Sequence, residues 1–120
     1  TISYVLVKSY NHCKSSVKLF GGEEDDYLAI HQWFDESKEH FADIRHRALR
    51  HHSQGIAECE KQFGVYIYNS DGKKVITKSI AEQHVREDIG FIPSVEDWLE
   101  LIKPQPWMAS TKRNIKMNLM

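Results

Sequence analysis

The segment HFADIRHRALRHHSQGIAECEKQF, residues 40–63, decides the fold that the sequence predicts. No proline interrupts it, and its single glycine, Gly55, sits inside an otherwise regular pattern. Apolar residues recur along it near the 3.6-residue period of an amphipathic helix. They are Phe41, Ile44, Ala48, Ile56, Cys59 and Phe63. We therefore expect one long helix, which at ~1.5 Å per residue would cross a small domain.

Two polar side chains fall within that apolar stripe. Advancing by ~100° per residue, Arg45 and His52 lie among the apolar residues. The opposite side of the helix carries Asp43, His46, Arg47 and Arg50. Because an unpaired buried polar group is costly, Arg45 and His52 need partners in the core. The helix therefore indicates a polar site without naming its reaction.

Composition and charge narrow the class of protein. The chain has 120 residues, the size of one domain. Its formal net charge of −1 gives no overall attraction to nucleic acid or to an anionic membrane. No apolar run approaches the ~20 residues of a membrane span, and the N-terminal stretch lacks the features of a secretory signal. Two distant cysteines, Cys13 and Cys59, are expected to be free thiols, which suits a reducing cytoplasm.

The remaining segments predict shorter elements around the long helix. Residues 2–7, ISYVLV, are β-branched and aromatic and are expected to form a short strand or an extended arm. Alternating apolar residues on both sides of Asp71-Gly72 predict a β-hairpin. Further helices are expected over residues 12–20, 24–38, 79–89 and 94–103.

Together these elements predict an α+β fold that is mostly helical, with about four to five helices and one β-hairpin. We expect a single domain over residues 1–108, which begins with the short strand or arm. Residues 109–120 are rich in basic side chains and are expected to form a C-terminal tail.

Three predicted helices each place an ionisable residue where the pattern requires an apolar one. These residues are His31 with Asp35 one turn on, His52 with Arg45, and His84 with Asp88 one turn on. Imidazoles and carboxylates from facing helices are how helical bundles build metal sites. One hypothesis is therefore a divalent ion (zinc, manganese or iron) whose ligands are His31, His52, His84 and Asp88.

Two functions follow from this cluster, one for each of two interpretations. With a metal, the protein would be a hydrolase of a phosphorylated or nucleotide substrate, in which Asp88 or Asp35 acts as base and Arg45 holds an anionic group. Without a metal, Arg45 would pair with Asp88 or Asp35 in a purely structural network. The protein would then be a non-enzymatic accessory protein that binds a host protein or a second copy of itself.

The segment HRALRHH forms a second polar cluster, on the outer side of the predicted long helix. Its basic side chains are His46, Arg47, Arg50 and His51. Such a face could hold phosphate or a nucleic-acid backbone. The other interpretation is a solvated face, since nearby acids balance its charge, and these are Glu36, Glu39 and Asp43.

Several segments resemble a known family, namely HCKSSVKLFGG, DYLAIHQWFDESK, RHRALRHHSQGI, IAEQHVREDIGFIPSVEDWL and KPQPWM. They are similar to a family of short, uncharacterised proteins of bacteria and their tailed phages, which carries a domain-of-unknown-function label. The resemblance covers about residues 12–108. It implies a cytoplasmic protein, in the host cytoplasm if a phage encodes it, and it brings no assigned activity, cofactor or substrate.

Overall fold

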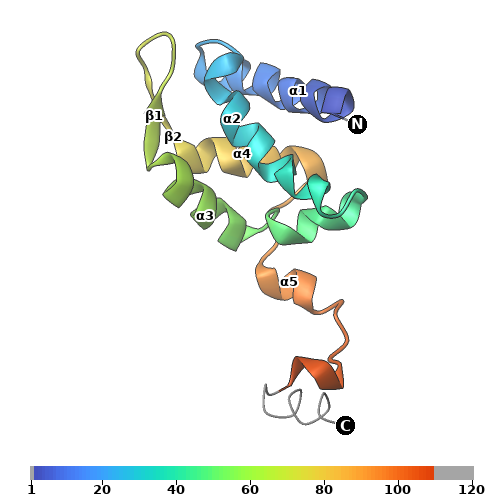
Figure 1. Cartoon of the computed structure of the whole chain (residues 1–120). Helices are drawn as coiled ribbons and strands as arrows, with labels where there is room; N and C mark the ends of the chain where they lie inside the picture. The colour runs from blue at the N-terminus through green and yellow to red at the C-terminus, as the bar shows by residue number, and fades with distance from the viewer. Residues whose placement is uncertain (1, 110–120) are drawn as a thin grey trace.

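The structure is a computed structural model that describes residues 2–109, and it is mostly helical with one β-hairpin (Figure 1). The α-helices are α1 (Ile2–Phe20), α2 (Asp25–Asp35), α3 (Ser53–Phe63), α4 (Thr77–Ile89) and α5 (Val95–Leu99). The strands are β1 (Tyr66–Tyr68) and β2 (Lys74–Ile76), and the short 3-10 helices are η1 (Glu36–Glu39), η2 (Ile44–Leu49) and η3 (Pro106–Met108). The predicted α+β class is confirmed.

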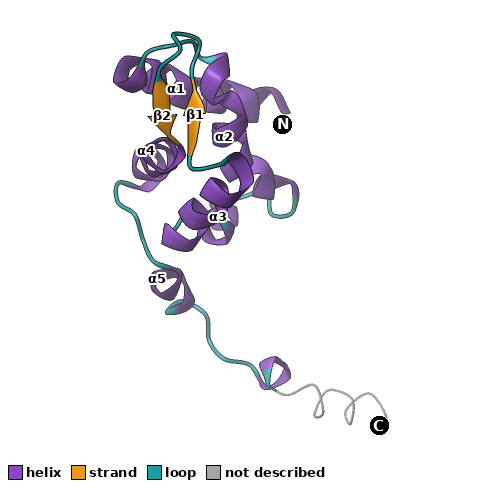
Figure 2. Ribbon diagram, turned by 90° about the vertical axis from the view of Figure 1, so that its left-hand side faces the viewer, coloured by secondary structure: helices purple, strands orange, loops and turns teal. Residues whose placement is uncertain are grey.

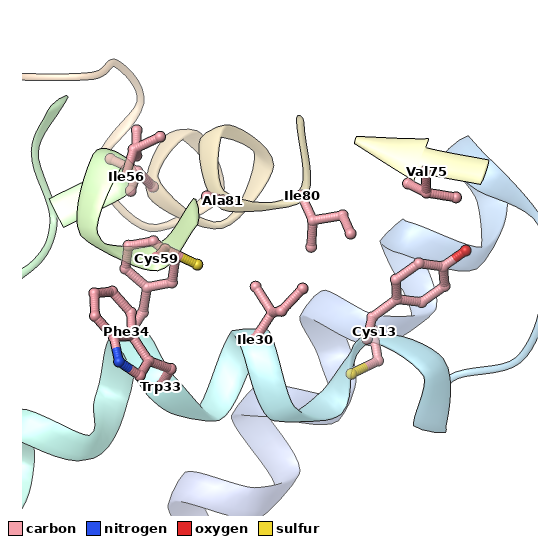
Figure 3. Close-up of a cluster of buried hydrophobic side chains, with 11 residues drawn as sticks. Cys13, Ile30, Trp33, Phe34, Ile56, Cys59, Val75, Ile80 and Ala81 are labelled. Carbon is pink, nitrogen blue, oxygen red and sulfur yellow. The ribbon is translucent and has the colours of Figure 1, made fainter. Parts of the chain in front are cut away.

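The core lies where α2 packs against α1 on one side and against α3 and α4 on the other (Figure 1). Figure 3 shows Ile30 and Phe34 of α2 facing Cys59 of α3 and Ile80 of α4. The side chains of Phe34, Cys59 and Ile80 are fully buried. Beside this small apolar core, buried polar side chains fill the interior where α1, α2 and α4 approach one another.

The expected long helix over residues 40–63 is wrong. The chain forms the 3-10 helix η2, turns at His51 and His52, and starts α3 only at Ser53. His52 is the N-cap of α3, and its Nδ1 accepts a hydrogen bond from the backbone N–H of Gly55 at 2.9 Å. A Cβ atom at Gly55 would overlap the carbonyl oxygen of Arg50, so only glycine fits this close approach. A capping histidine and a packed glycine thus break a pattern that periodicity alone reads as continuous.

The expected N-terminal strand or arm over residues 2–7 is also wrong, because α1 begins at Ile2. Neither proline nor glycine occurs between residues 2 and 20, so nothing separates the apolar start from the helix that follows. Gly21 and Gly22, both with positive φ, follow the last residue of α1, Phe20, and end the helix. The expected tail beyond Ala109 lies outside the described residues, and the domain limits stay a prediction.

The β-hairpin forms where Asp71-Gly72 predicted it. Its strands are antiparallel, with Tyr66 opposite Ile76 and Tyr68 opposite Lys74, and Gly72 adopts a φ of 77° in the turn. The hairpin is fastened to the helices through Asn69, whose side-chain amide donates to the carbonyl oxygen of Phe20 at 3.1 Å. An isolated hairpin is marginal in water, and these contacts supply the packing that it needs.

The C-terminal elements leave the body of the domain. Ser94 and Asp97 form a capping box at the start of α5, within the helix expected over residues 94–103. Beyond it, the chain runs away from the other helices through η3, and the principal extents of the molecule are 63 × 30 × 24 Å (Figures 1 and 2). Among residues 2–109, no helix has both the length and the apolar character that a membrane crossing requires.

Candidate metal centre

Six ionisable side chains meet in the interior where α1, α2 and α4 approach the turn before α3. They are His12 of α1, His31 and Asp35 of α2, His51 of the turn, and His84 and Asp88 of α4. The side chains of His31, His51 and His84 are fully buried, and that of Asp88 is 3% exposed. Burying six ionisable side chains together is costly unless each of their polar atoms has a hydrogen-bonding or charged partner.

Four of the residues predicted for the site are part of this cluster, and two are not. His31, Asp35, His84 and Asp88 converge as expected. His52 lies apart from them as the N-cap of α3. Arg45 lies on the surface, where its Nη2 is 2.7 Å from Oδ2 of the neighbouring Asp43. Neither His52 nor Arg45 contacts the cluster, because both depended on the long helix that does not form.

Sequence reasoning missed His12 and His51. His12 was expected to begin a short helix over residues 12–20, and its place in the cluster depends on α1 being one continuous helix from Ile2. His51 was assigned to the outer face of the long helix, whereas the turn before α3 directs it inward. The helical period alone indicated neither position. The only signal in the sequence was the high number of histidines around His51, which is typical of a polar site.

Four ligand atoms converge on one point within the cluster. They belong to His12, Asp35, His84 and Asp88, and all lie within 4.8 Å of one another. Nε2 of His12 is 3.1 Å from Oδ1 of Asp88, and Nε2 of His84 is 3.1 Å from Oδ2 of the same residue and 3.6 Å from Oδ1 of Asp35. Ligand atoms bonded to a tetrahedral zinc ion at ~2.0–2.1 Å lie ~3.3 Å apart, so the spacing suits a shared ion.

These atoms are close together without being hydrogen bonded to one another. Nε2 of His12, Nε2 of His84 and Oδ2 of Asp35 are buried and have no hydrogen-bond partner among the described residues. An orphaned buried polar atom carries a desolvation cost of ~1–3 kcal/mol. The two histidine nitrogens face the same carboxylate, that of Asp88, and a cation bound at this point would satisfy both of them.

The hydrogen bonds around His12 fix its tautomer. Its Nδ1 lies 2.8 Å from Oε1 of Glu87, and a carboxylate can only accept. Nδ1 therefore carries the proton, and in the neutral ring Nε2 presents a lone pair toward Asp88. A histidine oriented in this way by a carboxylate is the usual arrangement of a metal ligand.

A chain of hydrogen bonds places the proton of His84 on Nδ1, as in His12. The amide of Gln83 donates to the carbonyl oxygen of His12 at 2.9 Å, so its Oε1 accepts from the Ser16 hydroxyl at 2.6 Å. Ser16 Oγ then accepts from Nε2–H of His31 at 2.7 Å. Nδ1 of neutral His31 accepts in turn from Nδ1–H of His84 at 3.0 Å. Nε2 of a neutral His84 therefore also presents a lone pair to the two carboxylates.

The local field favours positive charge at this point. Burial lowers the pKa of His31 to about 2 and that of His51 to about 4, so both rings are neutral near pH 7. Burial acts on His84 in the same direction, but Asp35 and Asp88 outweigh it and raise its pKa. Burial would raise the pKa of Asp88, yet the hydrogen bond from His51 and the close imidazoles of His12 and His84 hold this pKa well below its usual range. Two carboxylates that stay ionised attract a proton or a metal ion to the space between them.

Asp88 is held by further side chains at the edge of the cluster. Nε2–H of His51 donates to its Oδ2 at 2.8 Å. Two cations stand near its Oδ1, with Nζ of Lys8 at 3.6 Å and Nη2 of Arg47 at 3.8 Å. Their side chains are 26% and 16% exposed, so both reach from the cluster toward solvent.

The outer basic face expected from HRALRHH does not form as a unit. His46 is 2% exposed, with Nδ1 2.8 Å from Ser37 Oγ, and His51 is fully buried. Arg47 points to Asp88, and the guanidinium of Arg50 stacks over the Trp33 ring at 4.0 Å. The turn before α3 rotates these side chains away from a common surface, so the prediction that His46 and His51 face outward is wrong.

The family model for a domain of unknown function, DUF6915, matches residues 7–108. The chain belongs to this family. The match covers each of the six residues of the cluster and continues through η3, so the DUF6915 unit includes the projecting C-terminal elements. No curated protein and no solved structure shows significant similarity to the chain.

Proposed function

We propose that this DUF6915 domain binds one divalent metal ion through Nε2 of His12, Nε2 of His84 and the carboxylates of Asp35 and Asp88. The observation that carries the proposal is the pair of buried imidazole Nε2 atoms, of His12 and His84, that lie beside two carboxylates without a hydrogen bond. In the absence of a cation this arrangement brings four electron-rich atoms within 4.8 Å of one another. One divalent ion would satisfy all four of them.

The donor set limits the kind of ion. Two imidazole nitrogens and two carboxylates suit zinc, manganese or iron, whereas calcium and magnesium prefer oxygen ligands. His84 and Asp88 are four residues apart on α4, so one helix turn supplies two ligands. The other two come from α1 and α2. A bound ion would therefore link three helices, α1, α2 and α4.

The competing account replaces the ion with protons. Protonated His12 and His84 would neutralise the carboxylates, and the cluster would be a structural network. Imidazolium N–H groups would then be expected to align with the carboxylate oxygens, but neither Nε2 atom has hydrogen-bond geometry toward them. The observed geometry therefore favours lone pairs directed at an ion.

Metal analysis of the protein purified without chelator tests the proposal. We expect about one equivalent of zinc, manganese or iron per chain, which is lost in His84→Gln and retained in His46→Gln. His46 is a suitable control because it is also buried, 2% exposed, but belongs to none of the four ligands. Metal well below stoichiometry in the wild type, with no uptake on titration, refutes the site.

A hydrolase acting on a phosphorylated or nucleotide substrate is the finer candidate function. Lys8 and Arg47 support it, because two partly exposed cations beside Asp88 could hold a phosphate group next to the ion. Arg47 thereby takes the role that sequence reasoning gave to Arg45. A bound ion would contribute by lowering the pKa of a water molecule toward neutrality.

Activity measurements separate the hydrolase from simple metal binding. The metal-loaded protein should hydrolyse p-nitrophenyl phosphate or a nucleotide. Arg47→Met should lower kcat/KM while the metal content stays unchanged. Absence of turnover from a stoichiometrically loaded protein rejects the hydrolase and leaves metal binding in place.

A further inference from the structure

The β-hairpin has an inner face that packs on α3 and α4 and an outer face that is open to solvent (Figures 1 and 2). Successive residues of a strand point to opposite faces. Ile67 and Val75 pack on the core. Tyr66, Tyr68 and Ile76 point outward, and their exposed fractions are 42%, 65% and 43%. An apolar set gathered on one face, unlike scattered apolar residues, is typical of an interaction site.

Two aromatic rings make up most of this outer face. Tyr66 and Tyr68 are two residues apart on β1, and their ring centroids lie 5.5 Å apart at an interplanar angle of 83°. Nζ of Lys74 lies 3.9 Å from the centroid of the Tyr66 ring, so Tyr68 is the more open of the two rings. Exposed aromatic rings on a strand are a common stacking surface for unpaired nucleic-acid bases.

The hairpin is locally positive in a chain whose net charge is −1. Residues 65–76 contain two lysines, Lys73 and Lys74, which are both exposed, and one acid, Asp71. Oδ2 of Asp71 accepts a hydrogen bond from the backbone N–H of Gly22 at 2.8 Å, which holds this carboxylate against the loop after α1. Positive charge beside exposed rings suits a single strand, because its phosphates need cations and its bases need flat apolar surfaces.

We propose that the outer face of the hairpin binds single-stranded nucleic acid, with a base stacked on Tyr68 and phosphates held by Lys73 and Lys74. The ring of Tyr68 accepts any base, since every base has a flat π-face. The two lysines favour a polyanion over an uncharged protein surface. A duplex keeps its bases stacked on one another and would contact the lysines alone, so the exposed rings favour a single strand.

Fluorescence anisotropy of a labelled oligothymidine, titrated with the full chain, tests the proposal. We expect binding that weakens as the salt concentration rises. Tyr68→Leu should weaken it ~10-fold, as loss of one stacked base does, whereas Tyr68→Phe keeps the ring and should bind like the wild type. Phe91→Leu is the matched control, because Phe91 is also exposed, at 58%, but lies outside the hairpin. It should leave the affinity unchanged.

Replacement of the lysines separates the local charge from the overall charge. K73Q/K74Q should reduce the slope of log K against the logarithm of the salt concentration by ~1.4, since each contact with a single-strand phosphate contributes ~0.7. K14Q/K18Q removes the same charge from exposed positions on α1 and should keep the slope of the wild type. Equal effects of the two pairs would show that the overall charge alone matters, and would overturn the proposal.

Three other results would also overturn it. The first is absence of binding by the wild type at low salt. The second is a duplex that binds as tightly as the single strand, since stacking on Tyr68 would then play no part. The third is displacement of the labelled strand by polyglutamate as readily as by unlabelled oligothymidine, which would indicate an acidic protein as the partner.

The proposal is independent of the metal centre. The hairpin leads directly into α4 at Thr77, about two helix turns before His84. All the hairpin variants should therefore keep the metal content of the wild type. A wild type that binds the oligothymidine without metal would retain the hairpin site and lose the metal site, and the reverse result would do the opposite.

Discussion

Nε2 of His84 lies 3.1 Å from Oδ2 of Asp88, one helix turn away, yet the two atoms form no hydrogen bond. On the other side of the ring, Nδ1–H of His84 donates to His31. In the neutral ring Nε2 then presents a lone pair to the carboxylate oxygen. The metal ion that we propose would lie between these two atoms and satisfy both.

Removal of the ion should destabilise the fold. Because the ligands come from α1, α2 and α4, an ion that binds only the folded state adds ~4 kcal/mol when its concentration is ~1,000 times Kd. EDTA should therefore lower the Tm measured by circular dichroism, and added metal should restore it. A Tm that is indifferent to both reagents contradicts the role of the ion as a link between helices.

Substitution of Ser16 should weaken the metal site without removing a ligand. Ser16 Oγ accepts a hydrogen bond from Nε2–H of His31, and loss of the hydroxyl lets the tautomers of His31 and His84 invert. We expect Ser16→Ala to weaken metal affinity ~10–100-fold, as changes beside a metal ligand do. Ser15→Ala on the same helix is the control, since the Ser15 hydroxyl donates to the Asn11 carbonyl oxygen within its own helix, not to the cluster. Equal affinities for the two variants, measured by competition with a chelating dye, would rule out the hydrogen-bond chain as the positioning device.

Substitution of His52 should affect stability alone. As the N-cap of α3, His52 accepts from Gly55 N–H, and loss of a cap costs ~1 kcal/mol. We expect His52→Ala to lower the free energy of unfolding by about that amount, and His52→Asn to recover most of it. The metal content should not change. A loss of metal in either variant would mean that His52 is a ligand after all.

The attachment of the hairpin should depend on pH. Asp26 accepts from the backbone N–H groups of Glu23 and Ser70 and from the Ser70 hydroxyl, at 2.7, 2.9 and 2.6 Å. Burial alone would raise the pKa of Asp26, but these hydrogen bonds hold it below its usual value. Such a group stabilises the fold above its unfolded pKa, and the contribution is lost as pH falls through its folded pKa.

Asp26→Asn should therefore be less stable than the wild type near pH 7, and the difference should shrink in acid below ~4. Urea unfolding at the two pH values measures it. Glu58→Gln, on the exposed side of α3, should show no such dependence. A difference for Asp26→Asn that is the same at both pH values would show that ionisation of this carboxylate is not what fastens the hairpin.

Periodicity and turn chemistry predicted much of the fold correctly. Asp71-Gly72 marked the hairpin, and Ser94 with Asp97 marked the start of α5, because each depends only on neighbouring residues. The break between η2 and α3 was not predictable in this way. It follows from the packing of Gly55 against the backbone of Arg50, which no helical period reports.

The residues of the candidate site likewise fall into those that the local sequence predicted and those that it did not. His31 and His84 were found because each interrupts an apolar stripe on a helix that does form, and Asp35 and Asp88 lie one turn from them. His12 and His51 were missed because their inward direction depends on α1 being continuous and on the turn before α3. The local sequence pattern was enough to predict the histidines and aspartates on α2 and α4. Tertiary structure determines that His12 and His51 join them in the cluster.

The most direct test of the central claim is anomalous X-ray diffraction at the absorption edge of the metal found in crystals of the purified protein. We expect a single strong peak between Nε2 of His12, Nε2 of His84 and the carboxylates of Asp35 and Asp88. Ordered rings with no peak at this point, from protein grown with the metal present, would contradict the proposed site.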